Sequence, residues 1–309
     1  EAADEVVLAP PHTVLKTSSG KVRRSACRER YEAGLIGTRP PAAGWQIARL
    51  ALAAATARAR RGRVLAAELA HAIRVGVLFA LIAPLTWLVT AALPRPSWAW
   101  AVGRLAARVF LRLCGTPVCV EGVAHLPPPG QVHVLVANHA SYVDGIVLAA
   151  ALPRHVSFVA KRELAGQFIP RVYLRRLGVE FVERFDVRQG AADADRLAAA
   201  VAGGRSLAVF PEGTFTRVAG LRPFHLGAFA AAARARVPVV PVVIRGSRGW
   251  LRADQWFPRR SRLEVFIGTP ILPPADAADE FGAAVRLRDA ARVEILQRCG
   301  EPEADPASS

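Results

Sequence analysis

Short apolar runs alternate with helix-like stretches from residue 118 toward the C-terminus, and this alternation constrains the fold more than any other feature of the chain. The predicted strands are Val118–Glu121, Val132–Ala137, Val156–Ala160, Glu180–Glu183, Ser206–Phe210, Val239–Ile244 and Leu263–Gly268. The predicted helices are Tyr142–Leu152, Glu163–Leu177, Gln189–Ala202, Leu226–Ala235 and Ala275–Gln297. Such alternation is typical of an α/β fold, in which helices flank a mostly parallel sheet.

Polar side chains follow several of the predicted strands. His139, Arg184 and Glu212 each come just after a strand. Because the loops at the C-terminal ends of parallel strands converge, we expect these three side chains to lie near one another. Lys161 follows a further strand and is a weaker candidate for the same site, since a solvated lysine explains it equally well.

Five positions separate His139 from Asp144. On one continuous helix they would lie about 140° apart, so they can meet only if His139 ends the strand and Asp144 begins the following helix. Asp144 would then accept the imidazole Nδ1–H and leave Nε2 as a general base. No obvious protein nucleophile completes a triad, so a substrate hydroxyl is the simplest nucleophile, which predicts direct acyl transfer to an alcohol. The spacing alone is a weak signal, because a polar strand end before a surface helix also produces it.

Four sequence blocks stand in order along the predicted α/β region. They are Asn138–Asp144, Gly178–Arg184, Phe210–Arg217 and Val237–Ile244. In order and spacing these blocks closely resemble the lysophosphatidic acid (1-acylglycerol-3-phosphate) acyltransferase family, from about Val118 to Pro270. The resemblance implies a glycerolipid acyltransferase-like α/β fold with an N-terminal helical membrane motif.

The same resemblance implies roles for individual residues. The catalytic pair falls on His139 and Asp144, and the acceptor-phosphate arginine falls on Arg184. The implied reaction moves a fatty acyl group from acyl-CoA or acyl carrier protein to the free hydroxyl of a lysophospholipid. The expected acceptor is 1-acylglycerol-3-phosphate, which would give phosphatidic acid, and no metal or cofactor is required. The Glu-Gly-Thr loop of the family falls on Glu212, Gly213 and Thr214.

One residue departs from the family pattern. Members usually have arginine directly after Glu-Gly-Thr, whereas this chain has Phe215, and the next arginine is Arg217. Either Arg217 takes over the role, or the acceptor carries a different head group. Glu212 also has a structural interpretation, as a carboxylate that caps the turn near Thr214. Gly213 favours close approach of the backbone to a ligand instead.

The chain carries a net charge of +16. Nucleic acid, an anionic membrane surface and anionic substrates are the three classes of partner that such a charge favours. The arginines are scattered among alanines without a recognisable nucleic-acid motif, so nucleic acid ranks last. The rival from another class is a non-catalytic, membrane-bound module that binds lipid or acyl carrier protein, and the intact His139 and Asp144 argue against it. The cysteines are not in metal-ligand or disulfide spacing, which fits a reducing, cytosol-facing location.

The N-terminal segment has a separate origin. Leu15–Arg24 resembles the last motif of adenylate-forming fatty-acyl ligases, in which the second lysine, here Lys21, reaches the adenylation site. The resemblance covers residues 1–37 alone, so we expect a ligase remnant without activity, and an acyl ligase domain as a partner in a longer, fused chain. Residues 38–73 are expected to be a linker, broken by Pro and Gly at Thr38–Gly44, followed by a connective helix.

A membrane motif is expected at residues 74–114, ahead of an acyltransferase domain at 115–309. Val75–Leu93 has no charged residue, Pro84 interrupts it, and arginines flank both ends, which favours a hairpin that returns to the same face of a membrane. In the next segment Trp98, Val102, Leu105, Val109 and Leu113 recur at helical spacing beside an arginine stripe. An interfacial amphipathic helix at the cytosolic face is therefore predicted, and a helix packed on the soluble domain is the alternative.

Overall fold

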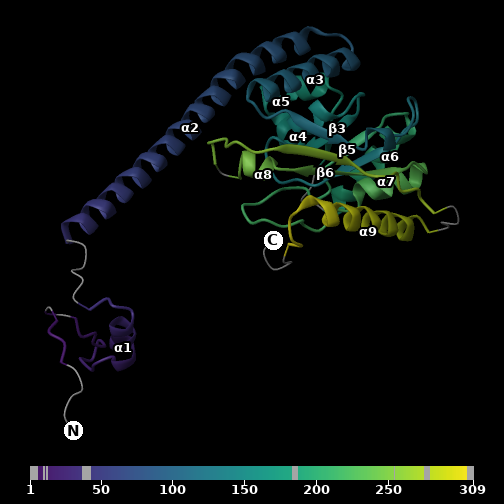
Figure 1. Cartoon of the computed structure of the whole chain (residues 1–309). Helices are drawn as coiled ribbons and strands as arrows, with labels where there is room; N and C mark the ends of the chain where they lie inside the picture. Colours follow the sequence, from purple (N-terminus) through teal and green to yellow (C-terminus); the bar gives the residue numbers. More distant parts are fainter. Residues whose placement is uncertain are drawn as a thin grey trace. The chain divides into compact units, whose positions relative to one another are not determined.

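The structure is a computed structural model that describes residues 6–9, 11, 13–36, 43–182, 187–253, 255–274 and 279–304 (Figure 1). The chain divides into two compact units, Glu1–Ala66 and Ala67–Ser309. Helix α2 (Ala43–Ala92) begins in the first unit and ends in the second.

The first unit contains a short hairpin before α1 (Arg24–Glu32). Lys16 and Val22 form an antiparallel bridge, and the backbone N–H of Gly20 donates to the Thr17 carbonyl at 2.9 Å. Gly20 has a φ of 82°, a left-handed conformation that costs glycine little. The hairpin turn therefore lies directly before Lys21. Residues 38–42 of the predicted linker at Thr38–Gly44 lie outside the described residues.

The second unit is built on one sheet, and the predicted α/β class is confirmed. Within the described residues its strands are β1 (Val118–Glu121), β2 (Val134–Ala137), β3 (Ser157–Lys161), β4 (Glu180–Val182), β5 (Leu207–Val209), β6 (Val239–Arg245) and β7 (Leu263–Ile267). They are ordered β1-β7-β6-β2-β5-β3-β4, and every neighbouring pair is parallel except β6 and β7. All seven predicted strands are present, with ends that differ from the prediction by at most two residues.

Helices cover both faces of this sheet. The helices that follow β1 in the described residues are η1 (Val123–His125), α4 (Asp144–Ala151), η2 (Arg162–Gly166), α5 (Phe168–Arg176), α6 (Val187–Ala202), α7 (Gly227–Ala235), α8 (Ser247–Trp250) and α9 (Glu280–Cys299). The helix predicted at Glu163–Leu177 is divided, because Gln167 is extended. Pro170 has no N–H for the preceding turn, so it is accommodated in the first turn of a new helix.

The central strands are buried on both sides, as parallel strands between helical layers require. Along β2, Val134 and Val136 pack into a core cluster with α7 and α9, while Leu135 and Ala137 pack into a second cluster with α3 and α4. This alternation follows the two-residue period of a strand. The sheet therefore holds its C-terminal strand ends rigidly between two packed layers.

Helix α2 differs from the prediction in one respect. It continues through Pro84, so neither the proline nor the boundary expected near residue 74 interrupts it. Val75, Leu78 and Ile82 pack into the cluster that contains α3, and this packing offsets the hydrogen bond that the proline cannot make. The chain turns back only at Leu93–Arg95, where α3 (Pro96–Leu113) begins.

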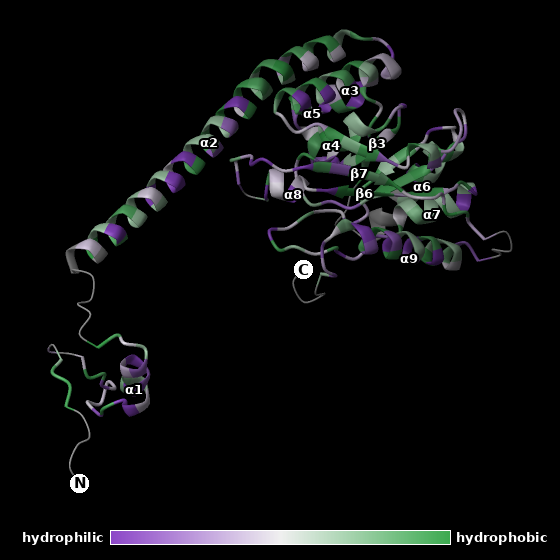
Figure 2. Cartoon of the chain, in the orientation of Figure 1, coloured by the Kyte–Doolittle hydropathy of each residue, from purple (hydrophilic) through white to green (hydrophobic). Residues whose placement is uncertain are grey.

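The apolar side chains of this helical pair point in two directions. On α3, Ala99, Trp100, Ala107, Phe110 and Leu111 are buried, whereas Trp98, Leu105, Val109 and Leu113 are exposed. Part of the expected amphipathic stripe thus lies in solvent while another face packs on the domain. By length and composition the stretch Ile47–Ala92 could also cross a membrane, and 11% of its most apolar window is buried. Figure 2 shows the apolar colour concentrated in the C-terminal part of α2.

Candidate active site

His139 and Asp144 are in direct contact. His139 follows β2, Asp144 is the first residue of α4, and His139 Nδ1 lies 2.9 Å from Asp144 Oδ2. The contact predicted from the spacing is therefore present, with the strand end and helix start that it required. The histidine side chain keeps 16% exposure, whereas the aspartate side chain has none. A buried carboxylate on Nδ1 fixes the tautomer in which Nε2 lacks a proton.

Asp144 also fixes the turn between the two residues. Its Oδ2 accepts the backbone N–H groups of Ala140 at 2.6 Å and Ser141 at 2.8 Å. The Ser141 hydroxyl in turn donates to the Leu251 carbonyl at 2.6 Å. One carboxylate oxygen thus organises the backbone after β2 and orients the imidazole, so loss of the side chain would disturb both.

Glu212 ties a second loop to the histidine. It follows β5, the strand next to β2, and its Oε1 accepts the backbone N–H of His139 at 2.6 Å. Its Oε2 accepts the backbone N–H of Arg222 at 2.8 Å. The side chain is buried, and both oxygens are engaged by backbone groups. The carboxylate therefore joins the two loops through their backbone N–H groups.

Burial has a large effect on this carboxyl group. It raises the pKa of Glu212 from the ordinary 4.5 to about 7. The N–H groups of Arg222 and His139 favour the charged form and oppose the rise, while the charges of Glu301 and Asp144 add to it. Near neutral pH this side chain can therefore change its charge inside the site.

The rest of the Glu-Gly-Thr loop passes beside the histidine. Gly213 has a φ of 74°, so the turn itself requires a glycine, and this explains the residue without a ligand. Thr214 is half-buried, and Arg217 is exposed farther along the loop.

Aromatic rings enclose the imidazole, and we did not predict this from the sequence. Phe210 stacks on His139 with centroids 4.3 Å apart, and Phe215 meets it edge-on at 4.5 Å. Tyr142 in turn packs against Phe215 at 4.7 Å. The residue that departs from the family pattern thus contacts the imidazole directly. The sequence signal that could have predicted this contact is Phe215 itself, a bulky apolar residue directly after the polar Glu-Gly-Thr motif.

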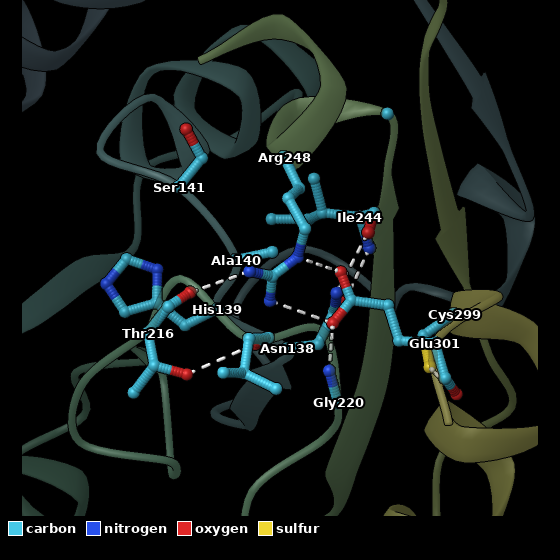
Figure 3. A network of polar contacts seen from close by, with 12 residues as sticks. Asn138, His139, Ala140, Ser141, Thr216, Gly220, Ile244, Arg248, Cys299 and Glu301 are labelled. Atoms are coloured by element: carbon cyan, nitrogen blue, oxygen red, sulfur yellow. Dashed lines mark hydrogen bonds and ion pairs between the residues drawn. The ribbon is translucent and has the colours of Figure 1, made fainter. Parts of the chain in front are cut away.

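A polar network holds the surrounding loops, as Figure 3 shows. The side chain of Asn138 donates to the Ile244 carbonyl at 2.9 Å and accepts the Ile244 N–H at 2.7 Å, which fixes the end of β2 to β6. Arg248 pairs with Glu301 through two contacts, of 2.6 and 2.9 Å. The same pair binds the loop after Glu212. Arg248 donates to the Thr216 carbonyl and Glu301 accepts the Gly220 N–H, at 2.7 and 2.9 Å.

The remaining predicted residues belong to the next two strands. Lys161 is the last residue of β3 and is half-buried. Since β3 is parallel to its neighbour β5, Lys161 and Glu212 both lie at the C-terminal ends of the strands. Arg184 lies outside the described residues. The strand that precedes it, β4, adjoins β3 at the margin of the sheet.

Comparison with known proteins identifies the region that carries this site. Residues 117–245 match the family model described as acyltransferase. The chain is 28% identical over 177 residues to a protein of Mycoplasma pneumoniae named probable 1-acyl-sn-glycerol-3-phosphate acyltransferase, which covers 53% of this chain and 65% of the relative. It is 37% identical over 139 residues to the sheep (Ovis aries) 1-acyl-sn-glycerol-3-phosphate acyltransferase alpha, covering 43% of this chain and 46% of the relative. The chain thus spans less than two thirds of both relatives.

The fold has a counterpart among solved structures. The 1-acyl-sn-glycerophosphate (LPA) acyltransferase from Thermotoga maritima superposes with a TM-score of 0.58 at 22% sequence identity. The match covers 77% of this chain and 98% of that protein. At this identity the likeness establishes the shared fold.

Proposed function

Residues 117–245 match the acyltransferase family, and from this premise we propose that the protein transfers a fatty acyl group from an acyl thioester to the free hydroxyl of a lysophospholipid. The observation that carries the proposal is the 2.9 Å contact between His139 Nδ1 and Asp144 Oδ2 at the end of β2. We propose 1-acylglycerol-3-phosphate as the acceptor, because the relatives from Mycoplasma pneumoniae and sheep are named for it. The product would be phosphatidic acid.

The proposed chemistry uses the histidine twice. With Nδ1–H bound to Asp144, Nε2 of His139 removes the proton from the acceptor hydroxyl as its oxygen attacks the thioester carbonyl carbon. The new C–O bond forms, the tetrahedral intermediate collapses and the C–S bond breaks. The imidazolium then returns its proton to the departing thiolate. The products are the diacyl lipid and the free thiol, and His139 is restored.

The acceptor phosphate is proposed to lie against the loops after β4 and β5. Arginine suits such a group, because its guanidinium can form two parallel hydrogen bonds to phosphate oxygens. We assign this role to Arg184 and Arg217, with Gly213, Thr214 and Lys161 beside them. Glu212 is proposed to act through the backbone of His139, since its two oxygens are already engaged by the N–H groups of His139 and Arg222.

The donor and the place of action complete the proposal. Acyl-CoA and acyl carrier protein are both anionic, and the net charge of +16 suits either of them. The enzyme is proposed to work on the cytosolic face of a membrane, with residues 74–114 lying along one leaflet. The exposed apolar side chains Trp98, Leu105 and Val109 of α3 support this location.

A second acceptor class is supported by Phe215. This ring lies 4.5 Å from the imidazole, where an aromatic surface suits a neutral or quaternary-ammonium head group better than a bare phosphate. The alternative function is therefore acylation of a lysophospholipid with another head group. A panel of lysolipids offered to the wild-type protein and to Phe215→Arg distinguishes the two. Preferred turnover of 1-acylglycerol-3-phosphate by the wild type supports the first assignment. Preferred turnover of another lysolipid by the wild type, with a gain for 1-acylglycerol-3-phosphate in the variant, supports the alternative.

The test of the function itself is product analysis. The purified chain is supplied with isotope-labelled acyl-CoA and the lysolipid panel, and mass spectrometry identifies the labelled lipids. Labelled phosphatidic acid above the protein-free control supports the proposal. Lipid binding without any labelled product would instead indicate the non-catalytic module.

Residues 1–37 are proposed to be the end of an acyl ligase domain, fused ahead of the acyltransferase domain. The support is the sequence resemblance at Leu15–Arg24 together with the hairpin before Lys21. In a longer chain such a ligase would supply activated acyl groups to the adjoining domain.

A further inference from the structure

The loop between α8 and β7 exposes two large aromatic side chains. Trp256 is 91% exposed and Phe257 is 65% exposed, and Trp256 is the most exposed aromatic residue in the described part of the chain. By contrast Trp250, six residues earlier, is buried and donates from Nε1 to Thr116 Oγ1 at 3.2 Å. An adjacent tryptophan and phenylalanine in solvent are costly unless something covers them.

The backbone that carries these two rings is fixed to the domain. Pro258 is buried, and the backbone N–H of Arg259 donates to the Trp250 carbonyl at 2.8 Å. These contacts hold the backbone of the turn in place, and in this conformation the rings of Trp256 and Phe257 point into solvent.

Basic residues flank the aromatic pair in the sequence. Arg252, Arg259 and Arg260 are exposed, while Arg262 pairs with Glu264 at 2.8 Å. Asp254 is the acidic residue of this stretch and lies outside the described residues. An aromatic tip beside several arginines has the composition of a segment that lies in the interface of an anionic bilayer.

The position of the loop favours a membrane as its binding partner. Arg259 and Arg260 lie beside His71 of α2, one helical turn before the uncharged run that starts at Val75. Beyond His71, α2 exposes Leu81, Leu85 and Leu88. The loop thus lies next to the apolar surface of α2, at the end where charged residues begin. In a bilayer this position corresponds to the interface with water, where Trp and Arg side chains are most favourable.

We propose that Gln255–Arg260 is a second membrane anchor, in which Trp256 and Phe257 enter the headgroup boundary and Arg259 and Arg260 bind anionic phospholipid headgroups. The proposal builds on the interfacial site of action given above. With the α2–α3 pair and this neighbouring loop both in contact with lipid, the second unit would contact one leaflet through two segments of the chain. The orientation of its strand ends toward lipid would then be fixed.

Environment-sensitive labels test the anchor directly. Cys27→Ser and Cys119→Ser remove the accessible thiols, and the fluorophore NBD is then attached to single cysteines at positions 256, 105 and 281. Phe281 of α9 is the matched control, because it is 68% exposed on the opposite layer of the sheet. The full chain is mixed with phosphatidylcholine vesicles, with and without phosphatidylglycerol. A blue shift and brighter emission at 256, larger with phosphatidylglycerol, and no change at 281 are expected.

A shift at 105 but none at 256 would overturn the anchor and leave the α2–α3 contact standing. No shift at either position would overturn the anchor as well. As a second measurement, Trp256→Ala with Phe257→Ala should weaken binding to phosphatidylglycerol-containing vesicles by about tenfold, and Phe281→Ala should not. Turnover of detergent-dispersed substrate is followed in parallel, because its loss would count against the proposed function and not against the anchor.

Discussion

The carboxylate of Glu212 accepts the backbone N–H of His139 at 2.6 Å, although 73 residues separate the two in the sequence. This contact joins the loops after β2 and β5, which are adjacent strands of the sheet. A buried carboxylate that holds the backbone of the proposed general base links the protonation state of one residue to the position of the other.

The stability of the protein should depend on pH through Glu212. Its pKa is about 7 in the folded protein and 4.5 ordinarily, so the folded state binds the proton more tightly. The stabilisation is complete below pH 4.5 and is lost as the pH rises through 7. Glu212→Gln cannot ionise, so between these limits the stability of the wild type should fall relative to the variant by up to about 3 kcal/mol. Thermal unfolding of both proteins across this range measures the difference, and a constant difference would refute the pKa assignment.

Asp144→Asn and Asp144→Ala should distinguish the catalytic effect of the Asp144 charge from its structural effect on the turn after β2. Asparagine keeps an oxygen that can accept from Ala140 and Ser141, so the fold should survive while turnover falls by about two to four orders of magnitude. Alanine leaves those buried N–H groups without an acceptor, and a drop in Tm should accompany the loss of activity. Equal Tm values for the two variants would show that the carboxylate does not organise the turn.

Arg184→Ala and Arg217→Ala should raise the KM for the acceptor far more than the KM for acyl-CoA, because both arginines are assigned to the acceptor phosphate. Steady-state kinetics with each substrate varied in turn measures the two constants. Arg288→Ala on α9 is the control, since Arg288 pairs with its neighbour Asp289. If the KM for acyl-CoA rises as much as the KM for the acceptor, these arginines do not bind the acceptor phosphate.

Deletion of residues 1–37 should leave acyl transfer unchanged. This segment lies within the first unit, whereas His139 and Glu212 belong to the second. ATP and free fatty acid should not replace acyl-CoA in the assay of either protein. Formation of acyl-adenylate by this chain alone would show that the segment is more than a remnant.

The sequence predicted the sheet well because its signals are local. The run Val239–Ile244 is apolar throughout, as a strand covered on both faces must be, and it forms β6. The contact between His139 and Asp144 was predictable for the same reason, since five residues and one strand-to-helix transition determine it.

Other features depend on packing between distant segments. Nothing near Pro84 indicates that α2 continues through it, because the stabilising contacts come from α3. The pairing of Arg248 with Glu301 joins residues 53 positions apart, and no motif marks it. The rings of Phe210 and Phe215 around His139 likewise arise only when the strand ends converge.

The central claim is that His139 is the general base of an acyltransferase, and His139→Ala tests it most directly. The variant and the wild type are given labelled acyl-CoA and 1-acylglycerol-3-phosphate, product is quantified by mass spectrometry, and circular dichroism and Tm confirm that both are folded. The account predicts that turnover falls by about two to four orders of magnitude in a folded His139→Ala protein. Turnover at the wild-type rate in that folded variant would contradict it.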